Sequence, residues 1–126
     1  MFYLIESSKS FYEVTLELEP VIQRLGFVVL HRHDMGEALR QRDMEFDEEC
    51  CTYAVCNYRH AEKALNADMR LSLLIPWRIA VFTENGSTRV GLLRPDVASA
   101  QTAAPGLNSV WQEVQEKLIM VLDEMR

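Results

Sequence analysis

The chain has 126 residues, of which 48% are hydrophobic and 25% are charged, a composition typical of one globular domain spanning residues 1–126. Its net charge of −6 argues against a nucleic acid or an anionic membrane surface as partner, because both require a basic face. The sequence shows no basic leader and no apolar run of membrane length, and its odd number of cysteines does not suggest a disulfide framework. We therefore expect a cytoplasmic protein with free thiols.

The N-terminal segment predicts a strand followed by a long helix. Apolar side chains alternate over residues 2–6, which favours a strand. Ser10 and Glu13 have the spacing of a capping box, and an apolar stripe with helical periodicity then runs to Gly26, a typical residue at the end of a helix. These signals predict a helix over residues 10–25.

The middle of the chain predicts strands separated by short helices. Residues 27–34 and 50–57 have strand character, and residues 35–42 and 58–66 are expected to form short helices. The apolar run 71–75 is expected to be extended up to the following proline.

Residues 77–94 predict a β-hairpin. The dipeptide Asn85-Gly86 is the preferred pair for a type I′ turn, because both positions need positive φ. This turn sets the register, so that Ile79 faces Leu92 on an apolar side that meets the helices. Ala80 then faces Gly91 on the opposite side.

A second long helix is predicted over residues 109–125. Ser109 and Gln112 have the spacing of a capping box, and an apolar stripe follows. Ile119 and Met120 lie off that stripe, as stray surface residues or as part of a subunit contact.

This order of elements predicts an α+β fold, in which two long helices cover one face of a largely antiparallel sheet. A two-layer sandwich of this kind leaves the other face of the sheet to solvent or to a partner. We therefore expect a homodimer that covers it.

Part of the sequence resembles the domain of unknown function 302 family, whose members are small bacterial and archaeal proteins. The similarity is carried by Ala54-Val55-Cys56-Asn57, Ala61, Ala64-Leu65, Leu73-Leu74-Ile75-Pro76, Gly86-Ser87-Thr88-Arg89-Val90 and Arg94-Pro95. The resemblance covers nearly the whole chain and implies a β-α-β4-α fold of TATA-binding-protein-like topology and a dimer. It implies no established activity.

The sequence departs from the family pattern at two positions. Tyr58 stands where relatives often have a proline, and Trp77 stands where they often have a second cysteine. Chemistry that requires two cysteines is therefore not favoured for this chain.

The candidate site is centred on Cys56, at the junction of a strand with a short helix capped by Asn57. The helix N-terminus favours a reactive thiolate, whereas burial favours an inert thiol, and His60 lies one turn further on. We take Cys56 and His60 as catalytic candidates. The predicted ligand-binding residues are Cys56, Asn57, His60, Pro76 and Trp77.

A weaker signal for metal comes from His31 and His33, which share one strand face and can supply two zinc ligands. The alternative is that both are partly exposed strand residues. The sequence specifies no cofactor.

Two functions follow from these signals. The first is a small dimeric module for ligand binding or regulation, without enzyme activity, whose small-molecule pocket lies between helices and sheet or near Cys56. The alternative is a thiol-dependent redox or sulfur-handling protein that uses Cys56, and it needs an accessible thiol.

Overall fold

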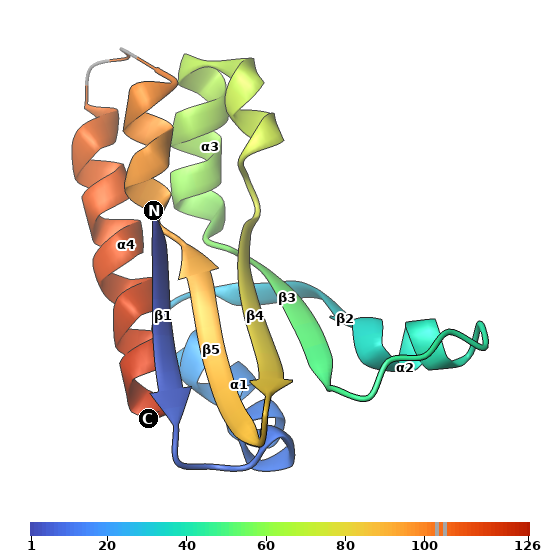
Figure 1. The fold of residues 1–126 in the computed structure, drawn as a ribbon. Helices are drawn as coiled ribbons and strands as arrows, with labels where there is room; N and C mark the ends of the chain where they lie inside the picture. The colour runs from blue at the N-terminus through green and yellow to red at the C-terminus, as the bar shows by residue number, and fades with distance from the viewer. Residues whose placement is uncertain (103, 105) are drawn as a thin grey trace.

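The computed structural model describes residues 1–102, 104 and 106–126. It contains one five-stranded antiparallel sheet, in the order β1-β5-β4-β3-β2, with helices packed against it (Figure 1). The α+β class is therefore as predicted. The elements are β1 (Phe2–Ser7), α1 (Phe11–Arg24), β2 (Val28–Asp34), α2 (Met35–Arg40), β3 (Cys50–Cys56), α3 (Tyr58–Ala67), the 3-10 helix η1 (Met69–Leu73), β4 (Trp77–Glu84), β5 (Ser87–Leu93), the 3-10 helix η2 (Pro95–Ala100) and α4 (Leu107–Glu124).

Helix α1 begins and ends as its sequence predicts. The Ser10 hydroxyl accepts a hydrogen bond from the Glu13 backbone at 3.1 Å, and the Glu13 carboxylate accepts one from the Ser10 backbone at 3.1 Å. Gly26 adopts a φ of 93° just after the helix, a conformation that favours glycine.

The two long helices pack against each other and cover one face of the sheet, which is how the apolar stripes are buried. In Figure 1, α1 lies behind β4 and β5, and α4 runs beside β1. The side chains between the layers are fully enclosed, with exposed fractions of 1% or less for Val14, Leu18, Ile22, Ile79, Val81, Val90, Trp111, Val114, Leu118, Val121 and Leu122.

Two local predictions were wrong. Helix α4 begins at Leu107 rather than at a capping box formed by Ser109 and Gln112, because Gly106 turns the chain with a φ of 83°. The segment predicted as extended over 71–75 instead contains η1, which ends at Leu73. The Asp68 carboxylate starts this turn by accepting a hydrogen bond from the Arg70 backbone at 3.0 Å.

The predicted hairpin is confirmed in its turn and its register. Asn85 and Gly86 have φ values of 51° and 84°. Ile79 is paired with Leu92, and Ala80 with Gly91. The hairpin therefore presents one apolar side to the helices and leaves its other side on the open face of the sheet.

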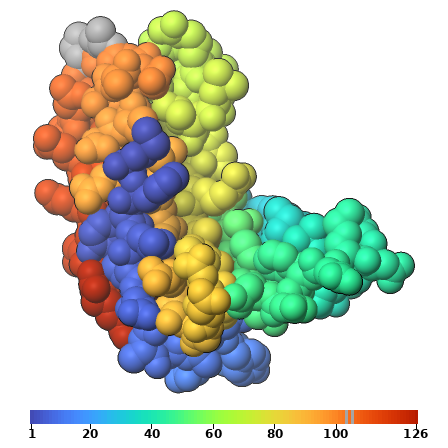
Figure 2. All heavy atoms as spheres, viewed as in Figure 1, coloured from blue at the N-terminus to red at the C-terminus, as the bar shows by residue number. Residues whose placement is uncertain are grey.

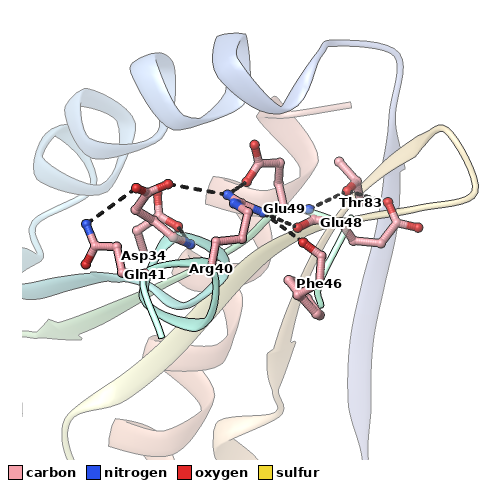
Figure 3. Close-up of polar contacts among 8 residues, drawn as sticks. Asp34, Arg40, Gln41, Phe46, Glu48, Glu49 and Thr83 are labelled. Atoms are coloured by element: carbon pink, nitrogen blue, oxygen red, sulfur yellow. Dashed lines mark hydrogen bonds and ion pairs between the residues drawn. The ribbon is translucent and has the colours of Figure 1, made fainter. Parts of the chain in front are cut away.

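Residues 35–49 form an arm, made of α2 and the loop after it, that projects away from the rest of the molecule (Figures 1 and 2). The Arg40 guanidinium holds this arm together by donating to the carbonyl oxygens of Phe46 and Glu48 at 3.2 and 3.1 Å, and to the Glu49 carboxylate at 2.8 Å (Figure 3). The Glu48 carboxylate accepts a hydrogen bond from the Thr83 hydroxyl at 2.8 Å. The arm is thereby tied to β4.

In the part of the chain that the structure describes, no helix is both long enough and apolar enough to cross a membrane.

Candidate functional site

Cys56 is a buried thiol at the end of β3. Its exposed fraction is 4%, and burial raises the pKa of the thiol above its ordinary value of 9.0. Asn57 caps α3 as predicted, because its side-chain oxygen accepts a hydrogen bond from the His60 backbone at 3.1 Å. Its side-chain nitrogen donates to the Gly26 carbonyl oxygen at 3.1 Å. Asn57 therefore joins α3 to the end of α1.

The His60 ring contacts groups outside the strand that carries Cys56. Its Nε2 lies 3.3 Å from the Glu113 carboxylate on α4, and its ring meets the Phe27 ring edge-on at 6.4 Å between centroids. These contacts tie α3 to α4 and to the start of β2. The ring has a structural role in addition to any catalytic one.

Pro76 and Trp77 are neighbours in sequence but differ in burial. Pro76 is exposed and follows a cis peptide bond from Ile75. Trp77 is only 7% exposed, and its ring packs edge-on against the Trp111 ring at 5.8 Å. Trp77, which stands where the family resemblance led us to expect a second cysteine, is therefore an aromatic core residue.

His31 and His33 lie on the same side of β2, with their rings stacked at 6.1 Å between centroids. Among the described residues, no three His, Cys, Asp or Glu side chains are grouped so that they could hold a metal ion. Among residues 1–102, 104 and 106–126, His31 and His33 therefore have no third metal-binding side chain beside them.

The other two thiols lie at the start of β3. Cys50 is half-buried and Cys51 is fully buried, and both thiols are free. Burial raises the pKa of each thiol. None of the three cysteines thus has a pKa lowered toward neutrality.

The clearest hollow lies elsewhere, on the open face of the sheet, which is turned toward the viewer in Figures 1 and 2. We call it the open-face groove, and its volume is about 450 Å³. It is lined by Phe2, Leu4, Arg78, Ala80, Phe82, Gly91, Leu92 and Leu93. None of the five predicted ligand-binding residues lines it.

Strand pairing explains why a hollow forms at this place. Leu4 on β1 is paired with Gly91 on β5, and Gly91 is paired with Ala80 on β4. Ala80 and Gly91 form a low floor at the centre because they have little or no side chain. Larger side chains surround this floor: Phe2 and Leu4 are 73% and 48% exposed, and Leu93 is 41% exposed.

Gly91 leaves space that the Leu4 side chain of β1 occupies. A Cβ at this position would lie 2.7 Å from the Leu4 side chain, which leans over the glycine. The absence of a side chain at Gly91 therefore lets Leu4 form one wall of the open-face groove.

Among the residues that the structure describes, Arg78 is the only charged one that lines the open-face groove. It is exposed and, among the described residues, its side chain has no hydrogen bond and no ion-pair partner within 4.0 Å. Arg89, on β5, also lies on the open face of the sheet, but its Nε is 3.7 Å from the Glu84 carboxylate. Arg78 therefore provides the groove with a positive charge that the protein does not neutralise.

Comparison with protein-family models matches residues 3–125 to the family described as Domain of unknown function DUF302. The chain belongs to this family. Among solved structures, it is similar to an uncharacterized conserved DUF302 protein from Bacillus stearothermophilus, with 26% sequence identity and a TM-score of 0.91. The similarity covers 99% of this chain and 98% of the other. A comparison with curated proteins gave no match.

Proposed function

We propose that this DUF302 protein is a binding module and that the open-face groove is its ligand site. The observation that carries the proposal is the groove itself, a hollow of about 450 Å³ whose lining is apolar except for Arg78. Small-molecule sites typically have volumes of about 300–1,000 Å³ and combine apolar walls with a few polar groups. Exposed apolar side chains gathered on one face commonly mark a binding site.

The proposed ligand is a small molecule with an apolar body. Phe2 and Leu4 leave large apolar areas in contact with water, and a bound apolar group removes that contact. Ala80 leaves room for it on the floor of the groove, beside the Leu4 side chain that covers Gly91.

A neutral apolar dye tests this proposal. Nile red fluorescence is titrated with the wild-type protein and with Ala80→Leu, which fills the floor of the groove without entering the core. We expect the substitution to weaken dye binding at least about fivefold, because a filled pocket excludes the ligand's apolar surface. Ala67→Leu adds the same side chain at an exposed position at the end of α3 and should leave binding unchanged. Equal binding by the wild type and Ala80→Leu would place the dye elsewhere and reject the proposal.

A second copy of the chain is the competing occupant of the same face. The homodimer stays a proposal, as does the TATA-binding-protein-like topology. The uncovered sheet face supports a dimer. Ile119 and Met120, however, lie on α4, which packs on the other face of the sheet. A single subunit contact therefore does not bury the open sheet face together with these two residues. Sedimentation at micromolar concentration decides: a mass near 14.6 kDa is a monomer. A dimer that is disrupted by Phe2→Glu would show that a second copy occupies the groove.

The thiol-dependent alternative receives less support. It requires an accessible and preferably ionised Cys56, whereas this thiol is 4% exposed and its pKa is raised by burial.

A further inference from the structure

The open-face groove has one charged end. Arg78 and Phe82 lie on the same strand, four residues apart, which corresponds to about 13 Å at the rise of a β-strand. Both side chains line the groove, one at each end, with Ala80 between them. A ligand lying along β4 therefore meets a guanidinium at one end and an aromatic ring at the other.

Arg78 differs in its polar contacts from two neighbouring arginines of the sheet. The chain carries a net charge of −6, and two of its other arginines near the sheet have partners: Arg89 lies near Glu84, and Arg32 donates to the Tyr53 hydroxyl at 3.2 Å. Arg78 has no such partner among the described residues, and every other residue that lines the groove is apolar. Apolar surroundings strengthen the attraction between a guanidinium and an anion, because they lower the local dielectric constant.

From this arrangement we propose that the ligand is an amphipathic carboxylate, with its acid group on Arg78 and its apolar body over Ala80 and against Leu4 toward Phe82. The planar guanidinium offers paired N–H donors that match the two oxygens of a carboxylate. A single cation suits a ligand with a single negative charge better than a phosphate monoester. This inference rests on the proposed function of the groove and adds the chemical class of its ligand.

The test compares decanoate with decanol, which share an apolar chain and differ in charge. Each is used to displace Nile red from the wild type, Arg78→Gln and Arg59→Gln. Arg59 is an exposed arginine on α3 that does not line the groove, so its substitution removes the same charge elsewhere. Thermal melting first confirms that each variant is folded, and Arg78→Lys serves as a further variant that keeps the charge but loses the planar fork.

We expect the wild type to bind decanoate more tightly than decanol. Arg78→Gln should weaken decanoate binding about fivefold to tenfold, the effect of removing a partly exposed charged hydrogen bond, and leave the decanol Kd unchanged. Arg59→Gln should keep the preference for the acid, and Arg78→Lys should keep part of it. Added salt should weaken decanoate binding to the wild type more than to Arg78→Gln, because salt screens the exposed charge.

Other outcomes separate the two proposals. If Ala80→Leu abolishes dye binding but decanoate and decanol compete equally, the groove is a ligand site and the carboxylate inference is wrong. If Arg78→Gln retains the full preference for decanoate, the acid binds to another cation and the inference is again wrong. If neither the dye nor decanoate binds the wild type, the proposed function fails and this inference fails with it.

Discussion

The three cysteines are expected to react with iodoacetamide at very different rates in the folded protein, in the order Cys50, Cys56, Cys51. The thiolate is the reactive form, and burial raises the pKa of all three thiols. Accessibility therefore separates them. Cys50 is half-buried at the start of β3, whereas Cys56 and Cys51 are 4% and 0% exposed.

The size of the difference follows from the need to open the structure. A thiol with an ordinary pKa of 9.0 is about 1% ionised at pH 7, and the raised pKa of Cys56 reduces that fraction further. A buried thiol at the end of a strand also requires local opening, which costs about 2 kcal/mol or more and lowers the reactive population about thirtyfold. Cys56 should therefore react at least about thirtyfold more slowly than Cys50.

Peptide mapping by mass spectrometry after timed alkylation measures the three rates, and protein unfolded in urea provides the reference in which all three react similarly. If Cys56 in the folded protein reacts as fast as Cys50 at pH 7, its thiol is accessible and the thiol-dependent function gains support.

The stability of two Cys56 variants tests the burial of this side chain independently of its reactivity. Cys56→Ala should cost about 1 kcal/mol in a buried apolar site, and Cys56→Ser should cost about 1–2 kcal/mol more because its hydroxyl is buried. Equal stability of the two variants in urea denaturation would contradict the buried position.

Two further predictions concern stability. Leu118→Ala should lower the free energy of unfolding by about 2–5 kcal/mol, because the side chain is 0% exposed and its removal leaves a cavity; Leu16→Ala, at a position that is 60% exposed, should change it by less than about 0.5 kcal/mol in the same urea titration. In Glu48→Gln, the melting temperature should fall less steeply than in the wild type as the pH is lowered into the acid range. Hydrogen bonds from the Asn85 backbone and the Thr83 hydroxyl lower the pKa of Glu48 below its ordinary 4.5. The stabilisation that the ionised Glu48 carboxylate provides is therefore fully present above pH 4.5, and it is lost as the pH falls through the lowered pKa. An unchanged acid slope in Glu48→Gln, with Glu45→Gln as control, would contradict this assignment.

The hairpin was predicted residue by residue because its turn chemistry and its apolar pattern agree. Asn85 and Gly86 tolerate the positive φ that a two-residue turn requires. Once that turn is placed, alternation alone determines that Ile79 and Val81 enter the core and that Ala80 and Phe82 face the open side. Helix α1 was predictable for the same reason, since its cap and its stripe indicate the same boundaries.

The wrong prediction for residues 71–75 arose because a short apolar run has no helical or strand periodicity, whereas the start of α4 was misplaced because Gly106, not a capping box at Ser109, begins the helix. Residues 71–75 are apolar enough for a strand, yet only Leu71 is fully buried, while Leu73 is 86% exposed. The deciding contact is the cap that Asp68 provides for η1, and an aspartate before a short apolar run is too common a signal to decide the conformation. Tertiary packing, which the sequence does not display, determines such segments.

The predicted site was drawn from residues that are close in the sequence. The fold keeps the ends of β3 and β4 side by side, with Val55 paired to Trp77, but the candidate residues differ in burial and in their contacts. Trp77 enters the core against Trp111, whereas Pro76 beside it is exposed. Asn57 and His60 are largely occupied in joining α3 to α1 and α4. A sequence motif of this kind can reflect a demanding junction between strand and helix as well as a reactive centre.

The open-face groove depends on one pairing that the sequence does not specify. The small pair Ala80 and Gly91 follows from the hairpin alone, but it becomes the floor of a hollow only when β1 lies beside β5. Strand β1 has apolar residues on both faces, so its periodicity does not reveal whether it is covered on both sides or on one. In the structure it is an edge strand, with Phe2 73% exposed. A phenylalanine at the rim of a hollow gains little from burial within the chain, and this exposure is the reason for proposing the open-face groove as a ligand site.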